Sequence, residues 1–101
     1  MDDVKIHWLS SALAELDGVY EYISRDNPKA ARGTFSRIRS ATVRLAEFPD
    51  SGCLGQLPGT RDLVVPGLPY LVVYRVRTAG IEILRVFHTS MKTPWTMNQA
   101  D

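Results

Sequence analysis

The chain has 101 residues, of which 45% are hydrophobic and 23% charged, with a formal net charge of +1. This length fits one domain, and a charge so close to zero gives no argument for nucleic-acid binding. No apolar run approaches the roughly 20 residues that span a bilayer. A single cysteine, Cys53, excludes an internal disulfide framework, and the acidic start lacks a signal-peptide pattern, so we expect a cytoplasmic protein.

The first elements follow from apolar spacing. Residues 4–8 alternate apolar and polar side chains, which predicts a short half-buried strand. From Leu9 to Ile23 apolar residues recur at steps of three and four, which predicts a helix with one buried stripe. We expect Ser10 or Ser11 to cap its first turn, because a hydroxyl accepts from the free N–H groups there.

A second helix is predicted after a break at Asp26. Asn27 is a favoured N-cap and Pro28 suits the first helical position. The apolar stripe runs from Ala31 to Leu45, and the short connection predicts an antiparallel helical hairpin. Four arginines lie in pairs on the shoulders of this stripe, where they either cover the core edges or bind an acidic partner. They are Arg32, Arg37, Arg39 and Arg44.

The second half of the chain is predicted to form strands. Residues 49–59 are rich in Pro and Gly and predict a loop. Strands are expected at Asp62–Val65, Tyr70–Thr78 and Ile81–His88. A two-residue turn at Ala79-Gly80 would set Arg77 opposite Glu82. The predicted fold class is therefore α+β, in which a strand, a two-helix hairpin and a three-stranded antiparallel meander form a small sheet packed on the helices. We expect one domain over residues 1–92 and a loose tail over 93–101.

Both faces of the predicted final hairpin are apolar. We expect Val72, Tyr74, Val76, Ile83 and Phe87 on one face, and Leu71, Val73, Leu84 and Val86 on the other. A helical hairpin covers only one face of a sheet. The other face then needs sheet curvature, the loop or another chain, which points to a protein that works bound to a partner.

Candidate chemistry is confined to Arg and His at strand ends. No metal or cofactor site is predicted, because His7 and His88 lack companions at ligand spacing, and Cys53 has no neighbouring base. Cleavage of an RNA phosphodiester needs a base, an acid and cations around the phosphorane. Arg61, Arg85 and His88 could supply them, although a surface or capping role for His88 is the simpler alternative, and Arg85 and His88 point to opposite faces in the assumed register.

Five segments, in order, resemble one family. Asn27–Ala31 resembles its interhelix turn, Leu45–Pro49 its second helix end and Gly59–Val65 its GxRxL strand, while Tyr70–Val76 and Ile81–His88 resemble its final hairpin. Over almost the whole chain, the sequence resembles the RelE/ParE superfamily of type II toxins.

This resemblance implies a compact α+β toxin that is neutralised by a cognate antitoxin, ParD-like or similar. The antitoxin would bind DNA through its N-terminal part and wrap the toxin with its C-terminal segment, so DNA is reached only indirectly. RelE-like members cut mRNA in the ribosomal A site, whereas ParE-like members poison DNA gyrase. The nucleases carry Arg where this chain has Leu71, and basic or aromatic residues where it has Thr89-Ser90-Met91, so the chain looks closer to ParE.

Three functions remain open at this stage. For a gyrase poison, the expected target-binding residues are Arg61, Arg75, Arg77, Arg85 and Lys92. For a ribosome-dependent endoribonuclease, the catalytic set would be Arg61, Arg85, His88 and Lys92. A homologue with weak or lost toxicity is the third alternative, because the tail departs from the His-Gly-Ala-Arg-Arg-Trp-Pro pattern of many ParE-like chains. The expected antitoxin-binding residues are Arg32, Arg37, Arg39, Arg44, Leu71, Val73, Leu84 and Val86.

Overall fold

The computed structural model describes residues 5–55 and 57–90. In chain order the elements are β1 (Lys5–Trp8), α1 (Ser10–Ser24), α2 (Pro28–Val43), the single 3-10 turn η1 (Arg44–Ala46), β2 (Cys53–Leu54), β3 (Arg61–Val64), β4 (Tyr70–Arg77) and β5 (Gly80–His88). The predicted α+β class and element order are confirmed, and β2 and η1 are additions. The predicted tail over 93–101 lies outside the described residues. Neither α1 nor α2 is long and apolar enough to cross a membrane.

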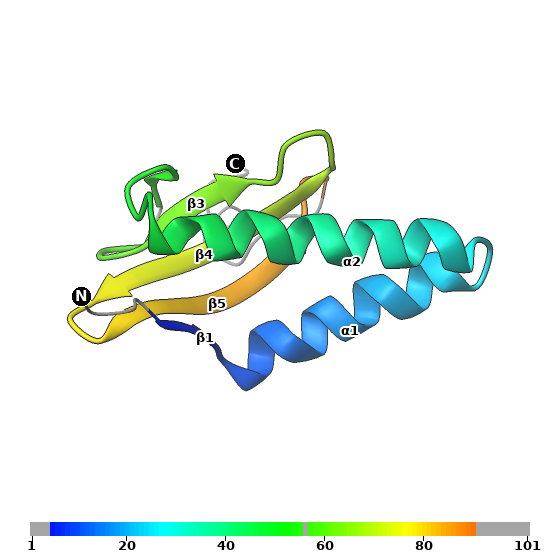
Figure 1. Ribbon diagram of the computed structural model, residues 1–101, viewed down its shortest axis with the longest axis horizontal. Helices are drawn as coiled ribbons and strands as arrows, with labels where there is room; N and C mark the ends of the chain where they lie inside the picture. Colours follow the sequence, from blue (N-terminus) through cyan, green and yellow to red (C-terminus); the bar gives the residue numbers. More distant parts are fainter. Residues whose placement is uncertain (1–4, 56, 91–101) are drawn as a thin grey trace, which may run out of the picture.

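The five strands form one mixed sheet in the order β1-β5-β4-β3-β2. β1 runs parallel to β5, and the other neighbouring strands are antiparallel. α1 and α2 lie side by side on the same face of this sheet, with α2 across the central strands and α1 along β5 (Figure 1). Residues 5–55 and 57–90 therefore form two layers, and no helix among them covers the second face of the sheet.

The two helix starts differ in their caps. Asn27 caps α2 as predicted, because its side chain accepts a hydrogen bond from Ala30 N at 3.0 Å. The expected serine cap of α1 is wrong, since the N-cap is Leu9 and has no side-chain cap bond. Ser11 Oγ instead donates to the carbonyl oxygen of Leu84 at 2.9 Å. The Ser11 hydroxyl, which was predicted to accept from a free N–H group of its own helix, thus links α1 to the sheet.

The turn between β4 and β5 lies one residue earlier than the sequence predicts. Thr78 and Ala79 form the turn, Arg77 pairs with Gly80, and Glu82 lies opposite Arg75, so the predicted pairing of Glu82 with Arg77 is wrong. Gly80 is a strand residue with φ of +150°, and a Cβ there would collide with the carbonyl oxygen of Lys5 on β1. The glycine is needed for this close approach of β1 rather than for the turn.

A bulge in β5 redistributes the side chains of the hairpin. Val73 pairs with Arg85 and Tyr74 with Ile83, which leaves Leu84 as the extra residue. The bulge reverses the alternation, so Val86 shares the helix-facing side with its partner Val72. The prediction that Val86 lies on the other face is therefore wrong. Phe87 pairs with Leu71 on that other face, and its predicted position beside Val72 is wrong too.

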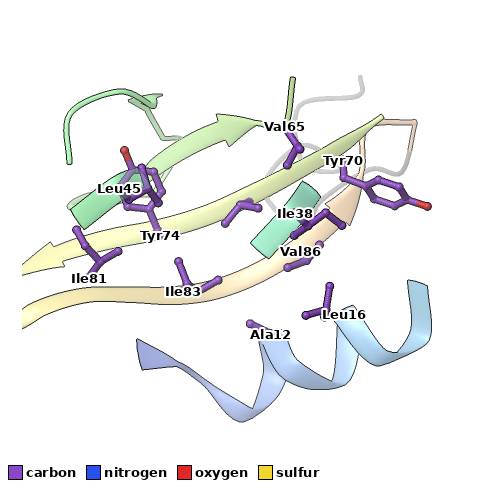
Figure 2. Packing of buried hydrophobic residues seen from close by; sticks show 11 residues of the cluster. Ala12, Leu16, Ile38, Leu45, Val65, Tyr70, Tyr74, Ile81, Ile83 and Val86 are labelled. Atoms are coloured by element: carbon purple, nitrogen blue, oxygen red, sulfur yellow. The ribbon is translucent and has the colours of Figure 1, made fainter. Parts of the chain in front are cut away.

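The core lies between the helices and the sheet (Figure 2). Its largest fully buried side chains come from α2, η1 and the two central strands; they include Ile38, Leu45, Tyr74, Ile81 and Ile83. Ala12 and Leu16 bring α1 onto the same cluster. Each fully buried aliphatic side chain contributes about 1.5–3 kcal/mol, so this single cluster accounts for the helical hairpin docking on one sheet face.

Candidate functional site

Arg61 begins β3, and its guanidinium is engaged within the protein. Nη1 donates to the carbonyl oxygen of Gly52 at 2.8 Å, and Nη2 lies 3.5 Å from the carboxylate of Asp50. The same loop is held from the core side, where Gly52 N–H donates to the Tyr74 hydroxyl at 3.0 Å and that hydroxyl donates to the Pro49 carbonyl at 2.7 Å. Arg61 and Tyr74 together fix the loop that leads into β2.

Arg85 is held by a carboxylate on α1. Its Nε lies 3.0 Å from both oxygens of Glu15, and its Nη2 lies 2.7 Å from Oε2. This bonding raises the pKa of Arg85 above its ordinary value. The guanidinium also lies 4.6 Å from the centre of the Phe87 ring. With a carboxylate on one side and a ring on the other, Arg85 has little freedom to follow a substrate phosphate.

His88 ends β5 on the helix-facing side. Its ring packs edge-on against Tyr70 with centroids 5.3 Å apart, and Nδ1 accepts from Ser90 N–H at 3.1 Å. His88 and Tyr70 are also paired with each other across β4 and β5. This geometry suits a local cap at the strand end. Lys92, the remaining member of the predicted catalytic set, lies outside the described residues.

The three described members of this set do not converge. Arg61 pairs with Tyr74 and His88 pairs with Tyr70, so they lie four residues apart along β4 and on opposite sides of it. That corresponds to about 14 Å along the strand and about 10 Å across it. Arg85 points to the opposite face from His88, as predicted, because their partners Val73 and Tyr70 alternate on β4. One phosphate cannot contact all three groups in this arrangement.

A hollow of about 490 Å³ lies between α1 and the end of β5. Its polar lining includes Glu15, Tyr22, Tyr70 and His88, and the rest is mainly apolar. Burial raises the pKa of the Tyr70 hydroxyl, and the neighbouring Tyr22 adds to the shift. Of the described residues that line this hollow, His88 alone can become a cation. It therefore offers little positive charge to a phosphate.

The turn end of the β4–β5 hairpin carries two arginines, of which one is paired with a carboxylate and the other is not. Arg75 Nε donates to Glu82 Oε1, and this hydrogen bond holds the pKa of Glu82 below its ordinary value, with the charges of Arg75 and Arg77 adding to the effect. Arg77 is exposed, and its guanidinium makes no hydrogen bond or ion pair with the part of the chain that the structure describes. Arg77 is thus the described member of the predicted target-binding set most available to another molecule.

The predicted antitoxin-binding arginines separate into two groups. Arg37 Nη2 donates to the carbonyl oxygen of Pro66 at 2.8 Å and lies against Gly67, so it ties α2 to the β3–β4 turn. Arg32, Arg39 and Arg44 are exposed on or directly after α2 and form no ion pair among residues 5–55 and 57–90. Only these three remain available to a partner.

The predicted apolar partner face is less open than the sequence suggests. Val86 belongs to the core cluster and Val73 is 1% exposed, while Leu71 and Leu84 are half-buried. Val64, which pairs with Leu71, is 58% exposed. The bulge at Leu84 accounts for the misplacement of Val86.

Three side-chain contacts that hold the fold around the site were absent from the sequence-based prediction. Glu15 and Ser11 reach the edge of β5, and Tyr74 anchors the loop through its hydroxyl. Glu15 reads as an ordinary solvent-facing residue of an amphipathic helix, so only three-dimensional proximity identifies it. In the described residues, no group of three or more His, Cys, Asp or Glu is placed to hold a metal ion, and Cys53 is exposed.

Comparison with known proteins identifies the family. The model of the family described as "ParE toxin of type II toxin-antitoxin system, parDE" matches residues 6–93. The protein Y4kP of Sinorhizobium fredii is 39% identical over 94 residues, which cover 93% of this chain and 97% of the relative. Toxin RelE2 of Caulobacter vibrioides is 33% identical over 86 residues, which cover 85% of this chain and 96% of the relative.

Solved structures agree with this fold. A chain of the chromosomal ParDE TA system from P. aeruginosa superimposes with a TM-score of 0.76 and 26% identity, covering 84% of this chain and 95% of that one. A mutant of the E. coli toxin RelE, solved in complex with an antitoxin RelBc peptide, gives a TM-score of 0.60 at 15% identity, covering 99% and 96%. This second likeness concerns the fold alone.

Proposed function

The chain belongs to the ParE toxin family of type II toxin–antitoxin systems, and from this premise we propose that it poisons DNA gyrase and is neutralised by a cognate antitoxin. In this proposal it acts by binding, with no active site of its own. The finer assignment to gyrase follows the ParE side of the superfamily, which the family match and the P. aeruginosa ParDE neighbour support.

The single observation that carries a binding action is the separation of Arg61, Arg85 and His88. Stabilising a phosphorane requires donors within about 3 Å of one developing charge. Here the guanidiniums of Arg61 and Arg85 are bonded to Gly52 and Glu15, and His88 lies four residues away from Arg61 along β4 and on the opposite side of that strand. Leu71, where the sequence resembles the nucleases but lacks their Arg, adds no charge to the sheet.

The target-binding surface is proposed at the turn end of the β4–β5 hairpin. Arg77 is its centre, because the guanidinium is exposed and unpaired in the described structure, and Arg75 lies beside it on the same strand. The sequence also suggested Arg61 and Arg85 for this role, but their guanidiniums are bonded to Gly52 and Glu15 within the protein. Lys92 stays a candidate from the sequence alone.

A purified-component supercoiling assay tests the proposal. Wild-type chain added to DNA gyrase is expected to inhibit supercoiling, and addition of the antitoxin is expected to restore it. Uninhibited gyrase at a large molar excess of folded chain would contradict the proposal.

The alternative is a ribosome-dependent mRNA endoribonuclease, favoured by the name of one relative, Toxin RelE2. The corresponding assay is translation-coupled mRNA cleavage with the wild-type chain and with His88→Ala. Cleavage that disappears in His88→Ala would favour this alternative over the gyrase proposal.

A further inference from the structure

The second face of the sheet differs in character between its two halves. Near the start of β4 it is apolar, around the pair of Leu71 and Phe87. Toward the β4–β5 turn its side chains come from β1, β4 and β5 and are charged or titratable. This half points away from the helices, because Glu82 lies between the core residues Ile81 and Ile83 along β5.

The outer row of this half consists of Lys5 on β1, Gly80 on β5 and Arg77 on β4, which are paired across the three strands. Neighbouring strands lie about 4.8 Å apart, so the Cα atoms of Lys5 and Arg77 are about 10 Å apart. Gly80 has no side chain, and the backbone of β1 occupies the place where its Cβ would lie. Two cations therefore stand on the same face of the sheet with only bare backbone between them.

The inner row consists of His7 on β1, Glu82 on β5 and Arg75 on β4. Arg75 Nε donates to Glu82 Oε1, which orients the guanidinium. This hydrogen bond lowers the pKa of Glu82, and the charges of Arg75, Arg77 and His7 lower it further. One carboxylate thus lies among several basic groups and neutralises only one of them.

The positive charge of the two rows remains uncompensated in the fold. Lys5 and Arg77 are exposed and form no ion pair within residues 5–55 and 57–90. We call Lys5, His7, Arg75 and Arg77 the basic cluster. With Glu82 included and His7 neutral, its three cations and one carboxylate carry +2, which exceeds the +1 of the whole chain. A local excess of this kind attracts an anionic partner even when the net charge of the protein is small.

Resting on the proposed function, we propose that the basic cluster binds the phosphodiester backbone of the DNA duplex on which gyrase acts. Lys5 and Arg77 pair with phosphates of one strand, and the bare backbone at Gly80 lets that strand approach closely. The toxin would then contact DNA directly, in addition to its contacts with the enzyme.

The polar character of the basic cluster favours a phosphate backbone over a protein partner. A protein interface has an apolar centre, whereas phosphate contacts need only cations and hydrogen-bond donors. Val76 is 47% exposed, but it alternates with Arg75 and Arg77 along β4 and so points to the other face. Single-stranded nucleic acid binds largely by stacking on aromatic side chains, and the cluster contains no Phe, Tyr or Trp. A duplex therefore fits the cluster best.

Fluorescence anisotropy with a labelled DNA duplex of about 20 base pairs tests the site, starting at about 50 mM salt. Two or three phosphate contacts predict that the logarithm of the association constant falls with the logarithm of salt concentration with a slope of about −2 to −3. Lys5→Glu with Arg77→Glu is expected to weaken binding at least about tenfold at low salt. Lys5→Ala with Arg77→Ala should reduce the salt slope by about two.

A matched double variant locates the contact. Arg25→Glu with Lys29→Glu also reverses one Arg and one Lys, at the connection between α1 and α2, and is expected to change affinity by less than about threefold. Circular dichroism checks that each variant is folded. If the reversal at Lys5 and Arg77 impairs folding, the Ala pair provides the test through its salt slope.

No binding of the duplex at low salt, or equal loss in the two reversal variants, would overturn the proposal. Tighter binding of a single-stranded RNA of the same length would assign the cluster to an RNA backbone, and equally tight binding of a Glu-rich peptide would assign it to a protein. Either result would also overturn the proposal.

The supercoiling assay separates this proposal from the proposed function. A chain that inhibits gyrase but does not bind the duplex overturns the DNA contact and leaves the proposed function in place. A chain that binds the duplex as expected but leaves gyrase unaffected contradicts the proposed function and leaves the basic cluster as a phosphate site.

Discussion

Glu15 on α1 and Arg85 on β5, seventy positions apart in the chain, form an ion pair with an Nη2–Oε2 distance of 2.7 Å. Oε1 of Glu15 also accepts a hydrogen bond from Val86 N–H at 2.8 Å. β1 pairs with β5 only from Gly80 to Ile83, so beyond Ile83 the Glu15 carboxylate accepts a backbone hydrogen bond on the edge of β5 that β1 does not reach. One side chain thereby joins the helical layer to the sheet and satisfies an edge of β5 that β1 leaves open.

Replacing Glu15 by Ala is expected to lower the free energy of unfolding by about 1–2 kcal/mol, because Val86 N–H and Arg85 both lose their partner. The loss stays this small because the side chains of Glu15 and Arg85 are partly exposed to solvent. Chemical denaturation measures the loss. Asp17→Ala on the exposed side of the same helix is the control and should change stability by less than about 0.5 kcal/mol. Equal effects of the two changes would contradict the role of Glu15.

Tyr74→Phe tests the anchoring of the loop before β2. The ring is fully buried, and its hydroxyl bonds to both Gly52 N–H and the Pro49 carbonyl. Loss of the hydroxyl leaves these groups without their partner, so the unfolding free energy should fall by about 1–3 kcal/mol. Tyr22→Phe, at a side chain that is 72% exposed, is the control and should have little effect. Unchanged stability in Tyr74→Phe would show that the hydroxyl is dispensable.

The sequence predicts the helical hairpin and the order of the strands because both depend on local patterns. Apolar periodicity gives the helices, and Asn27-Pro28 marks the start of α2. The bulge at Leu84 has no local signal, so the faces of Val86 and Phe87 were assigned incorrectly. Gly80 appeared to be a turn glycine, because the contact with Lys5 that requires it comes from the far end of the chain.

The candidate site is less predictable than the fold, for a physical reason. An arginine in a sequence shows its charge but not its partner. Arg61, Arg37 and Arg85 look equivalent to Arg77, yet the first three are bonded to Gly52, Pro66 and Glu15. Those partners lie nine, twenty-nine and seventy positions away. Availability for a target is therefore a property of the tertiary structure.

Asp62 is expected to make stability depend on pH. Its Oδ1 is buried and has no hydrogen-bond partner in the described structure, and burial raises the pKa of the carboxyl above its ordinary value of 3.8. The folded state then favours the protonated form, so this residue lowers stability as pH rises through that window, and the loss is complete at neutral pH.

Asp62→Asn should therefore raise the unfolding free energy at pH 7 by up to about 1 kcal/mol, discounted for partial exposure. The advantage should disappear below the ordinary pKa, where both states of the wild type are protonated. Thermal unfolding at pH 7 and at pH 3 measures the difference. A destabilised Asp62→Asn protein at pH 7 would mean that the charged carboxylate has a favourable interaction.

Arg77→Glu is expected to weaken inhibition of gyrase by about tenfold or more, because it reverses the exposed charge at the centre of the proposed target surface. Arg25→Glu makes the same reversal at the end of α1, outside every proposed surface, and should leave inhibition unchanged. Supercoiling assays over a concentration series give the half-inhibitory concentration of each variant. Equal potency of the two variants would remove Arg77 from the target surface.

In the proposed function this toxin acts by binding gyrase and not by cutting RNA. The most direct measurement is the amount of linear DNA released after gyrase, plasmid and purified wild-type chain are incubated and then treated with detergent and protease. We predict an increase in linear DNA with chain concentration that the antitoxin abolishes. No increase over gyrase alone, at concentrations where the chain cleaves mRNA in a translating extract, would contradict the claim.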